Sequence, residues 1–226
     1  EQFFSDQLSE LGYDWKQFQE LGIYQPGAHG FEYEKYEKGL LRFDGEPGFN
    51  TITGQIEAYS ILYESWGEDP LPYYEEPPES PISTPELFEE YPYVLTTGAR
   101  TWEYFHSEER MVPRLRESHP DPLVDLHPDT AAKIGVTEGD WIWVENMRGK
   151  CKQRVRFNAS LKLDTVRAEH GWWFPEQDGE EPNLFGVWKS NFNSLVPHFN
   201  VGKLGFGAPY KGVMCNLRRV RSLDAD

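Results

Sequence analysis

Short hydrophobic runs separated by turn residues fill the second half of the chain, and they predict β-strands. Runs of β-branched and aromatic residues flanked by Gly, Pro, Asn or Asp are typical of an all-β domain. The runs that fit are Tyr93–Thr97, Leu123–Leu126, Trp141–Glu145, Lys150–Phe157, Thr165–Glu169 and Val213–Val220. The third and fourth flank Arg148-Gly149, which predicts a hairpin. Six short strands indicate a mainly β fold built as a closed six-stranded barrel.

Helical patterns are short and few. One helix is predicted to begin at Pro128, where proline suits the first turn, and to end at Gly135. A second is predicted near the start of the chain, capped by Asp14 and ended by Gly22. Its apolar face is formed by Trp15, Phe18 and Leu21. This face needs a packing partner, either in the domain that follows or in a missing domain that precedes it.

Proline density divides the chain into three parts. Residues 66–92 hold Pro70, Pro72, Pro77, Pro78, Pro81 and Pro85, which fix φ repeatedly and remove hydrogen-bond donors. We expect an extended linker there, with at most one helical turn over Glu86–Glu90. The predicted domains are therefore an irregular N-terminal extension, or the tail of a preceding domain, over 1–65, the linker over 66–92, and the barrel over 93–226.

Charge is concentrated in the first part. Residues 1–92 carry 20 acidic and 4 basic side chains, whereas residues 93–226 carry 18 of each. An acidic extension indicates a solvated periphery and argues against nucleic-acid binding, while the barrel keeps enough Lys and Arg to neutralise a phosphorylated ligand. No apolar run approaches the roughly 20 residues that span a membrane. The start shows no targeting pattern, and we expect the chain to be cut from a longer one.

Cysteine usage excludes a cysteine-built metal centre within this chain. Cys151 and Cys215 are far apart in sequence, and no CxxC pair is present. A structural zinc or iron–sulfur site needs about four grouped ligands, so two isolated cysteines cannot form one. Two buried thiols are the expected state, and a disulfide between them remains an alternative.

Candidate chemistry gathers at the end of the first predicted strand, in YVLTTGARTWEYFHS over residues 93–107. Gly98 permits a turn that a β-carbon would obstruct, and Arg100 offers a five-donor fork for phosphate or carboxylate. Aromatic side chains and His106 follow. This order predicts a cradle for a flat, anionic, heterocyclic ligand. The alternative is a buried strand followed by an ordinary surface loop.

Five blocks of sequence resemble one family in the same order. A strand ending in TGxR and a loop ending in HS are followed by HPDTAAKIGVTEGDWIWVENMRGK at 127–150, AEHGWWFPE at 168–176, LFGVWKSNFNSLVP at 184–197 and GFGAPYKGVMCNLRRV at 205–220. Together they resemble the C-terminal domain of molybdopterin or tungstopterin oxidoreductases, the dimethyl sulfoxide reductase superfamily. The later blocks look most like thiosulfate/polysulfide reductase and acetylene-hydratase-like catalytic subunits. In the phrase at 43–60 that also resembles the family, Gln55 replaces its usual lysine.

The resemblance implies a double-psi β-barrel that binds molybdopterin guanine dinucleotide carrying molybdenum or tungsten. It implies two-electron or oxygen-atom transfer by the whole enzyme, a role in anaerobic respiration, and a 4Fe-4S cluster and metal-ligating side chain in the missing N-terminal part. Those missing domains are the expected partners, together with an iron–sulfur electron-transfer subunit and a membrane anchor. This chain alone is then expected to be inactive. A periplasmic location is favoured by the resemblance, and a cytoplasmic one stays open.

Site residues are carried over from matching motif positions. They are Thr97, Gly98, Ala99, Arg100, Tyr104, His106, Ser107, Asn191, Asn193, Tyr210 and Lys211. The turn would bind pyrophosphate or pterin, and the loop would reach the pterin, with His106 near the metal but not catalytic by itself. The alternatives are a satisfied loop histidine, ordinary turn asparagines and a plain strand start. In the block at 168–176, packing is favoured for the tryptophans, and Glu176 is a weaker candidate for a ligand contact.

A second hypothesis comes from the aromatic content. With 8 Trp and 12 Tyr, the chain also fits a secreted, aromatic-rich binding module, for example for carbohydrate. That hypothesis predicts exposed tryptophans in a line. The cofactor-binding hypothesis predicts instead that the 98–107 loop and the turns at Asn191, Tyr210 and Lys211 meet at one groove.

Overall fold

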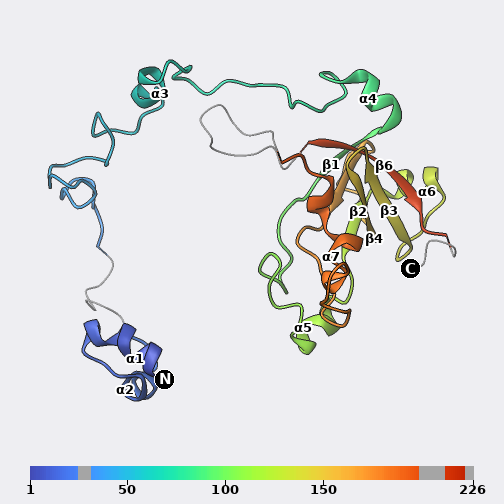
Figure 1. Cartoon of the computed structure of the whole chain (residues 1–226). Helices are drawn as coiled ribbons and strands as arrows, with labels where there is room; N and C mark the ends of the chain where they lie inside the picture. The colour runs from blue at the N-terminus through green and yellow to red at the C-terminus, as the bar shows by residue number, and fades with distance from the viewer. Residues whose placement is uncertain (25–31, 199–211, 222–226) are drawn as a thin grey trace. The chain divides into compact units, whose positions relative to one another are not determined.

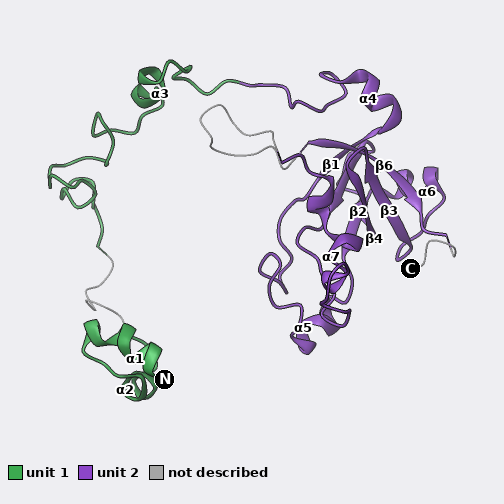
Figure 2. Ribbon diagram, in the orientation of Figure 1, with its two compact units in different colours: residues 1–73 green, residues 74–226 purple. Residues whose placement is uncertain are grey.

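The structure is a computed structural model that describes residues 1–24, 32–198 and 212–221. The chain divides into two compact units, residues 1–73 and residues 74–226 (Figure 2). The division falls inside the predicted proline-rich linker. Tyr210 and Lys211, two of the predicted site residues, lie outside the described residues.

The first unit contains only short helices. They are α1 (Gln2–Leu8), the 3-10 helix η1 (Ser9–Leu11), α2 (Trp15–Leu21) and α3 (Ile61–Ser65) (Figure 1). The predicted capped helix is confirmed as α2. The Asp14 side chain accepts from the Gln17 backbone, the Gln17 side chain accepts in return from the Asp14 N–H, and Gly22 ends the helix. The rings of Phe4 and Trp15 stack at 4.7 Å and join α1 to α2.

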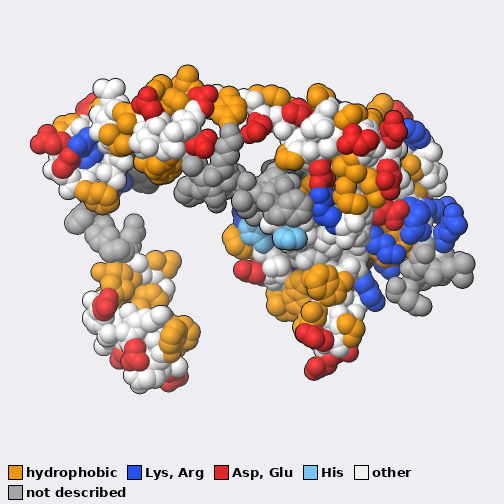
Figure 3. Space-filling model, turned by 45° about the horizontal axis from the view of Figure 1, so that its top comes forward, with side chains coloured by type: hydrophobic (Ala, Val, Ile, Leu, Met, Phe, Trp, Pro, Cys, Tyr) orange, Lys and Arg blue, Asp and Glu red, His pale blue; other side chains and the backbone are white. Residues whose placement is uncertain are grey.

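This unit builds no hydrophobic core from its described residues. Among those residues the buried positions are all glycines, whereas large apolar side chains such as Phe43 and Ile56 are 96% and 79% exposed. Figure 3 shows hydrophobic side chains at the surface of the molecule. An isolated chain gains little free energy from such exposed groups, so the fold of unit 1 rests on local turns and caps.

The second unit holds a closed barrel of six strands. They are β1 (Tyr93–Thr96), β2 (Leu123–Leu126), β3 (Trp141–Asn146), β4 (Gly149–Phe157), β5 (Thr165–Ala168) and β6 (Val213–Arg219). All six predicted strands are confirmed within two residues at either end, and so is the β3–β4 hairpin. Their order around the barrel is β1-β5-β2-β4-β3-β6.

The strand order identifies the barrel as double-psi. β1 runs parallel to β5, β2 runs parallel to β4, and the remaining neighbours are antiparallel. Exchanging the first three strands for the last three leaves this order and these directions unchanged. Two interlocked halves of that kind make a closed sheet with no free edge. Every strand therefore has a hydrogen-bonded neighbour on both sides.

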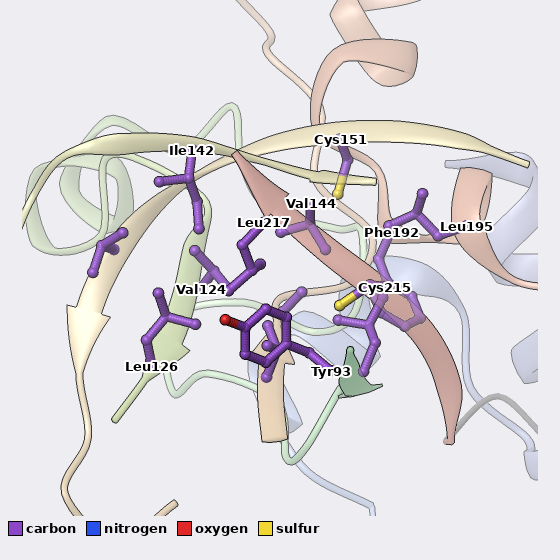
Figure 4. Close-up of a cluster of buried hydrophobic side chains, with 14 of the residues drawn as sticks. Tyr93, Val124, Leu126, Ile142, Val144, Cys151, Phe192, Leu195, Cys215 and Leu217 are labelled. Atoms are coloured by element: carbon purple, nitrogen blue, oxygen red, sulfur yellow. The ribbon is translucent and has the colours of Figure 1, made fainter. Parts of the chain in front are cut away.

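One hydrophobic core fills the barrel. Strand residues with alternating burial point inward, as Figure 4 shows for Tyr93, Val124, Leu126, Ile142, Val144 and Leu217. Both cysteines belong to this core and are free thiols, as expected. Burial raises the pKa of Cys151 to about 12, so this thiol stays protonated and unreactive at neutral pH.

The second unit also contains short helices. They are α4 (Pro85–Glu90), α5 (Pro113–Ser118), α6 (Pro128–Ile134), η2 (Leu184–Gly186), α7 (Val187–Ser190) and η3 (Phe192–Leu195). Of these, α4, α6, α7 and η3 contact the strands. The predicted helix ending at Gly135 is confirmed as α6, and α4 is the predicted helical turn after the prolines. No helix of the described residues is long and apolar enough to cross a membrane.

Part of the proline-rich segment packs on the barrel. Glu79 is buried, forms an ion pair with Arg148 of the β3–β4 turn, and accepts from the N–H of Met214 in β6. Residues 66–84 contain neither helix nor strand, in agreement with the predicted extended segment.

Candidate functional site

The turn that follows β1 has an exposed row of backbone donors. Gly98 lies in the left-handed region at φ 63°, which reverses the chain directly after the strand. The N–H groups of Gly98, Ala99 and Arg100 donate no hydrogen bond within the described ranges. Successive free N–H groups at such a turn form a concave, electropositive site for an anion.

Arg167 of β5 holds this turn in place through hydrogen bonds. Its guanidinium donates to the Ala99 carbonyl and to the Asp125 carboxylate of β2, both at 2.7 Å. A β-carbon on Gly98 would lie 2.0 Å from the Arg167 Nε, so only glycine leaves room for this arginine. The glycine therefore serves the conformation of the turn and also the packing beneath it.

Asp125 ties three strands together at the same place. The carboxylate is 2% exposed and accepts from Arg167 and, at 2.7 Å, from Arg156 of β4. Burial acts to raise the pKa of Asp125, but the hydrogen bonds and charges of the two arginines outweigh it, so the net pKa is lowered. The aspartate stays ionised and holds the base of the turn rigid.

Arg100 and two histidines form a chain on the exposed side of the turn. The Arg100 guanidinium is 3.4 Å from His106 Nε2 and lies over the Phe105 ring at 4.4 Å. His106 Nδ1 is 3.1 Å from Nε2 of His170, which follows β5. Histidine side chains are visible at the surface of unit 2, next to a hydrophobic patch, in Figure 3. The structure thus joins two sequence blocks that lie 64 residues apart.

A hollow opens beside the row formed by Arg100, His106 and His170. It has a volume of about 410 Å³ and is lined by Ala99, Arg100, Thr101, Trp102, Tyr104, Phe105 and Glu109. Trp102 is 99% exposed at its rim. A small recess next to it is lined by Arg100, His106, Glu169 and His170. Aromatic walls with a guanidinium suit a ring-bearing anionic ligand.

A buried ion-pair network supports the loop. Arg110 is 1% exposed, with its guanidinium between the rings of Tyr104 and Trp172 at 4.6 and 4.8 Å. It faces Glu169 at 3.6 Å, and Glu169 accepts in turn from His119, whose Nε2 is 2.8 Å away. Burial lowers the pKa of Arg110, opposed by the charge of Glu169. An arginine remains charged under such a shift, so the network is ionic.

Four of the predicted residues have specific hydrogen-bond partners. The Tyr104 hydroxyl donates to the His119 carbonyl at 2.6 Å, and the side chain, which is 3% exposed, belongs to the packed wall of the hollow. The Ser107 carbonyl accepts from the Trp173 indole at 2.5 Å. Asn191 caps η3, and its side chain accepts from the Asn193 N–H at 2.9 Å.

The asparagine turn is connected to the loop through one glutamine. Gln153 of β4 is fully buried and donates to the carbonyls of Glu169 and Ser190. These two residues directly precede His170 and Asn191. The structure therefore brings Gly98, Arg100 and His106 together directly, and links Asn191 to them through this bridge. The predicted contribution of Tyr210 and Lys211 falls outside the described residues.

Sequence patterns missed several supporting residues. Arg110 and Arg167 carry no local motif, because each meets its carboxylate partner in a distant segment. Packing of Trp172 was expected, and Trp172 is fully buried. Glu176 forms a partly exposed ion pair with Arg116 at 3.0 Å. The histidine at 170 lies in a recognised block, which is the one signal that marks it.

The donor set fits the phosphate-bearing part of a cofactor and not a metal ion. Free backbone N–H groups and a guanidinium favour anions. Within residues 1–24, 32–198 and 212–221, no group of three or more His, Cys, Asp or Glu side chains is placed to hold a metal ion. One end of the barrel therefore carries a set of donors suited to an anion, next to aromatic side chains.

The chain belongs to the family of the Molydopterin dinucleotide binding domain, whose profile matches residues 93–213. It is 39% identical to acetylene hydratase of Syntrophotalea acetylenica over 75% of this chain, and 35% identical to dopamine dehydroxylase of Eggerthella lenta over 81%. The solved structure of acetylene hydratase from Pelobacter acetylenicus matches 94% of this chain with a TM-score of 0.74 and 31% identity.

This chain spans about a quarter of those relatives. It covers 24% of the first, 20% of the second and 28% of the solved structure. The expected family, barrel and molybdopterin cofactor class are confirmed. Nothing in these similarities supports a secreted carbohydrate-binding module. The domain is thus of the kind found in catalytic subunits of molybdopterin oxidoreductases.

Proposed function

We propose that this chain binds the pterin and guanine nucleotide parts of a molybdopterin guanine dinucleotide within a larger catalytic subunit. The observation that carries this proposal is the turn at Gly98–Arg100. Its three backbone N–H groups donate to no acceptor among the described residues, and with a guanidinium they stand beside an aromatic hollow. Such a donor set neutralises phosphate, and the rings supply flat contact surfaces.

Each remaining site residue has a proposed role. The Thr97–Arg100 turn binds the pyrophosphate side of the cofactor, and the loop with Tyr104, His106 and Ser107 lies against the pterin. Asn191 and Asn193 offer amide donors and acceptors, which suit the amide-like edge of a pterin or guanine ring. Tyr210 and Lys211 add a stacking or hydrogen-bonding group and a phosphate-directed cation.

The whole enzyme would carry the chemistry. A bound molybdenum or tungsten cofactor would supply two-electron or oxygen-atom transfer, with a 4Fe-4S cluster in the part of the polypeptide beyond this chain. An iron–sulfur subunit and a membrane anchor are proposed partners, with a periplasmic location favoured over a cytoplasmic one. Relatives named as a hydratase and a dehydroxylase differ in reaction, so this domain alone does not select the substrate.

Removing the Arg100 guanidinium tests the proposed role directly. In the whole polypeptide, Arg100→Ala is expected to lower bound guanine nucleotide by about tenfold, because one charge-assisted phosphate contact is lost. Acid-released GMP per polypeptide is the measurement. Arg114→Ala, at an exposed arginine of α5, is the matched control and should keep the wild-type content. Equal GMP content in both variants would remove Arg100 from the site.

A further inference from the structure

The contact between His106 and His170 has a defined direction. Arginine can only donate hydrogen bonds, so the His106 Nε2 that faces Arg100 must be the unprotonated nitrogen. A neutral His106 then carries its proton on Nδ1 and donates it to His170 Nε2. That nitrogen must also be unprotonated, which places the His170 proton on Nδ1. The geometry therefore requires one tautomer for each ring.

Backbone contacts hold the two histidine segments in register. The Arg110 guanidinium donates to the His106 carbonyl at 2.6 Å and to the His170 carbonyl at 3.5 Å. A β-carbon on Gly171 would lie 3.2 Å from the His106 carbonyl carbon, so these backbones are nearly in contact. His106 itself has φ 54°, a conformation that costs a non-glycine residue free energy. A strained residue held by a fully buried arginine is a fixed part of the site.

The surroundings of His170 favour a neutral ring. Arg100 and Arg110 oppose a second proton on His170, Glu169 favours it, and burial disfavours the charged form. The pKa of His170 is lowered, first by burial and then by its neighbour His106. A second proton on either ring would direct an N–H at another donor, Arg100 in one case and the partner histidine in the other.

We propose that His170 is a positioning residue that acts through His106 on Arg100. It accepts the Nδ1 proton of His106, which leaves His106 Nε2 as the acceptor that holds Arg100 beside the hollow. His106 is then a neutral clamp with both nitrogens occupied, and it transfers no proton to or from the ligand. The assignment of the anionic ligand rests on the proposed function. The assignment of the tautomers rests only on the contacts among Arg100, His106 and His170.

Nitrogen NMR of histidine-labelled protein tests the clamp. In the 226-residue chain at pH 7.5, His106 and His170 should both carry the Nδ1 proton, with signals assigned by their loss in His106→Gln and His170→Gln. His170→Leu has no acceptor, so His106 should shift toward the Nε2-protonated form. His170→Gln provides an amide oxygen near the same point and should preserve the Nδ1 form. An Nε2-protonated or doubly protonated His106 in the wild-type chain would overturn the proposal.

Affinity for inorganic pyrophosphate tests the effect on Arg100. The Kd is expected to rise about five- to tenfold in His170→Leu and less than about twofold in His170→Gln, since a mispositioned charge-assisted contact loses about that much. Equal Kd values in both variants would overturn the action on Arg100. A wild-type chain that binds no pyrophosphate would contradict the proposed phosphate site. The NMR experiment would then still test whether His170 accepts the Nδ1 proton of His106.

Discussion

At the scale of single residues, the site depends on Gly98 and Arg167, which occupy adjoining space under the turn. Gly98 leaves the space that Arg167 fills, and Arg167 in turn holds the Ala99 carbonyl and Asp125. Sequence inspection finds the glycine because TGxR is a local motif. It cannot find Arg167, because nothing in β5 distinguishes this arginine from the other outward-facing side chains of a strand.

A comparison of Gly98→Ala with Gly135→Ala separates the cost of backbone strain from the cost of displacing Arg167. Both glycines have left-handed φ values, 63° and 71°, but a β-carbon at Gly135 meets nothing within 4 Å. We expect Gly135→Ala to cost about 1–2 kcal/mol of unfolding free energy. Gly98→Ala should cost roughly 2 kcal/mol more, because it displaces Arg167 from buried Asp125. Urea denaturation of the 226-residue chain measures the unfolding free energy of both variants. Equal losses would show that Arg167 can move away from the new β-carbon without a loss of stability.

The supporting network shows where prediction from sequence stops. Arg110, Arg114 and Arg116 lie within one short stretch, and of these three only Arg110 is buried, between two aromatic rings. Its partner Glu169 lies 59 positions further along the chain. Local patterns carry no information about this ion pair, because the two residues meet only when the barrel has folded.

At the scale of elements, Asp125 connects β2 to β4 and β5 at the end of the barrel that carries the site. The strands themselves were predictable, because alternation and turn dipeptides are local signals. The helices α5, α7 and η3 were not. They have four to six residues and take their stability from tertiary contacts, such as the Ser190 hydroxyl of α7 donating to the Lys152 carbonyl.

Acid titration of stability tests the Asp125 connection. A carboxylate whose folded-state pKa is lowered stabilises the protein above its unfolded-state pKa of about 3.9, and this contribution disappears as pH falls through the folded-state value. The unfolding free energy of wild type should therefore fall steeply below about pH 4. Asp125→Asn should start about 2–4 kcal/mol lower at pH 7 and show a shallower acid limb.

Asp129→Asn is the control for that titration, since its carboxylate is 79% exposed at the start of α6. This variant should reproduce the wild-type acid limb. An Asp125→Asn curve parallel to wild type would mean that the arginine pairs contribute nothing to acid stability.

At the scale of the whole molecule, the two units differ in what stabilises them. Unit 2 has a closed sheet, a hydrophobic core and the candidate site. Unit 1 exposes large apolar side chains and carries much of the acidic excess. The fold class followed from strand count, and its double-psi form from the resemblance. The proposed boundaries at residues 65 and 92 stay predictions, as does the role of Tyr210 and Lys211.

The central claim is that this domain holds a molybdopterin guanine dinucleotide in a larger polypeptide. The most direct measurement is the molybdenum, tungsten and acid-released GMP content of the whole polypeptide, purified anaerobically from a cofactor-competent host. We predict about one metal and about two GMP per polypeptide, as two bound dinucleotides on one metal require. A folded protein with neither metal nor nucleotide would contradict the claim.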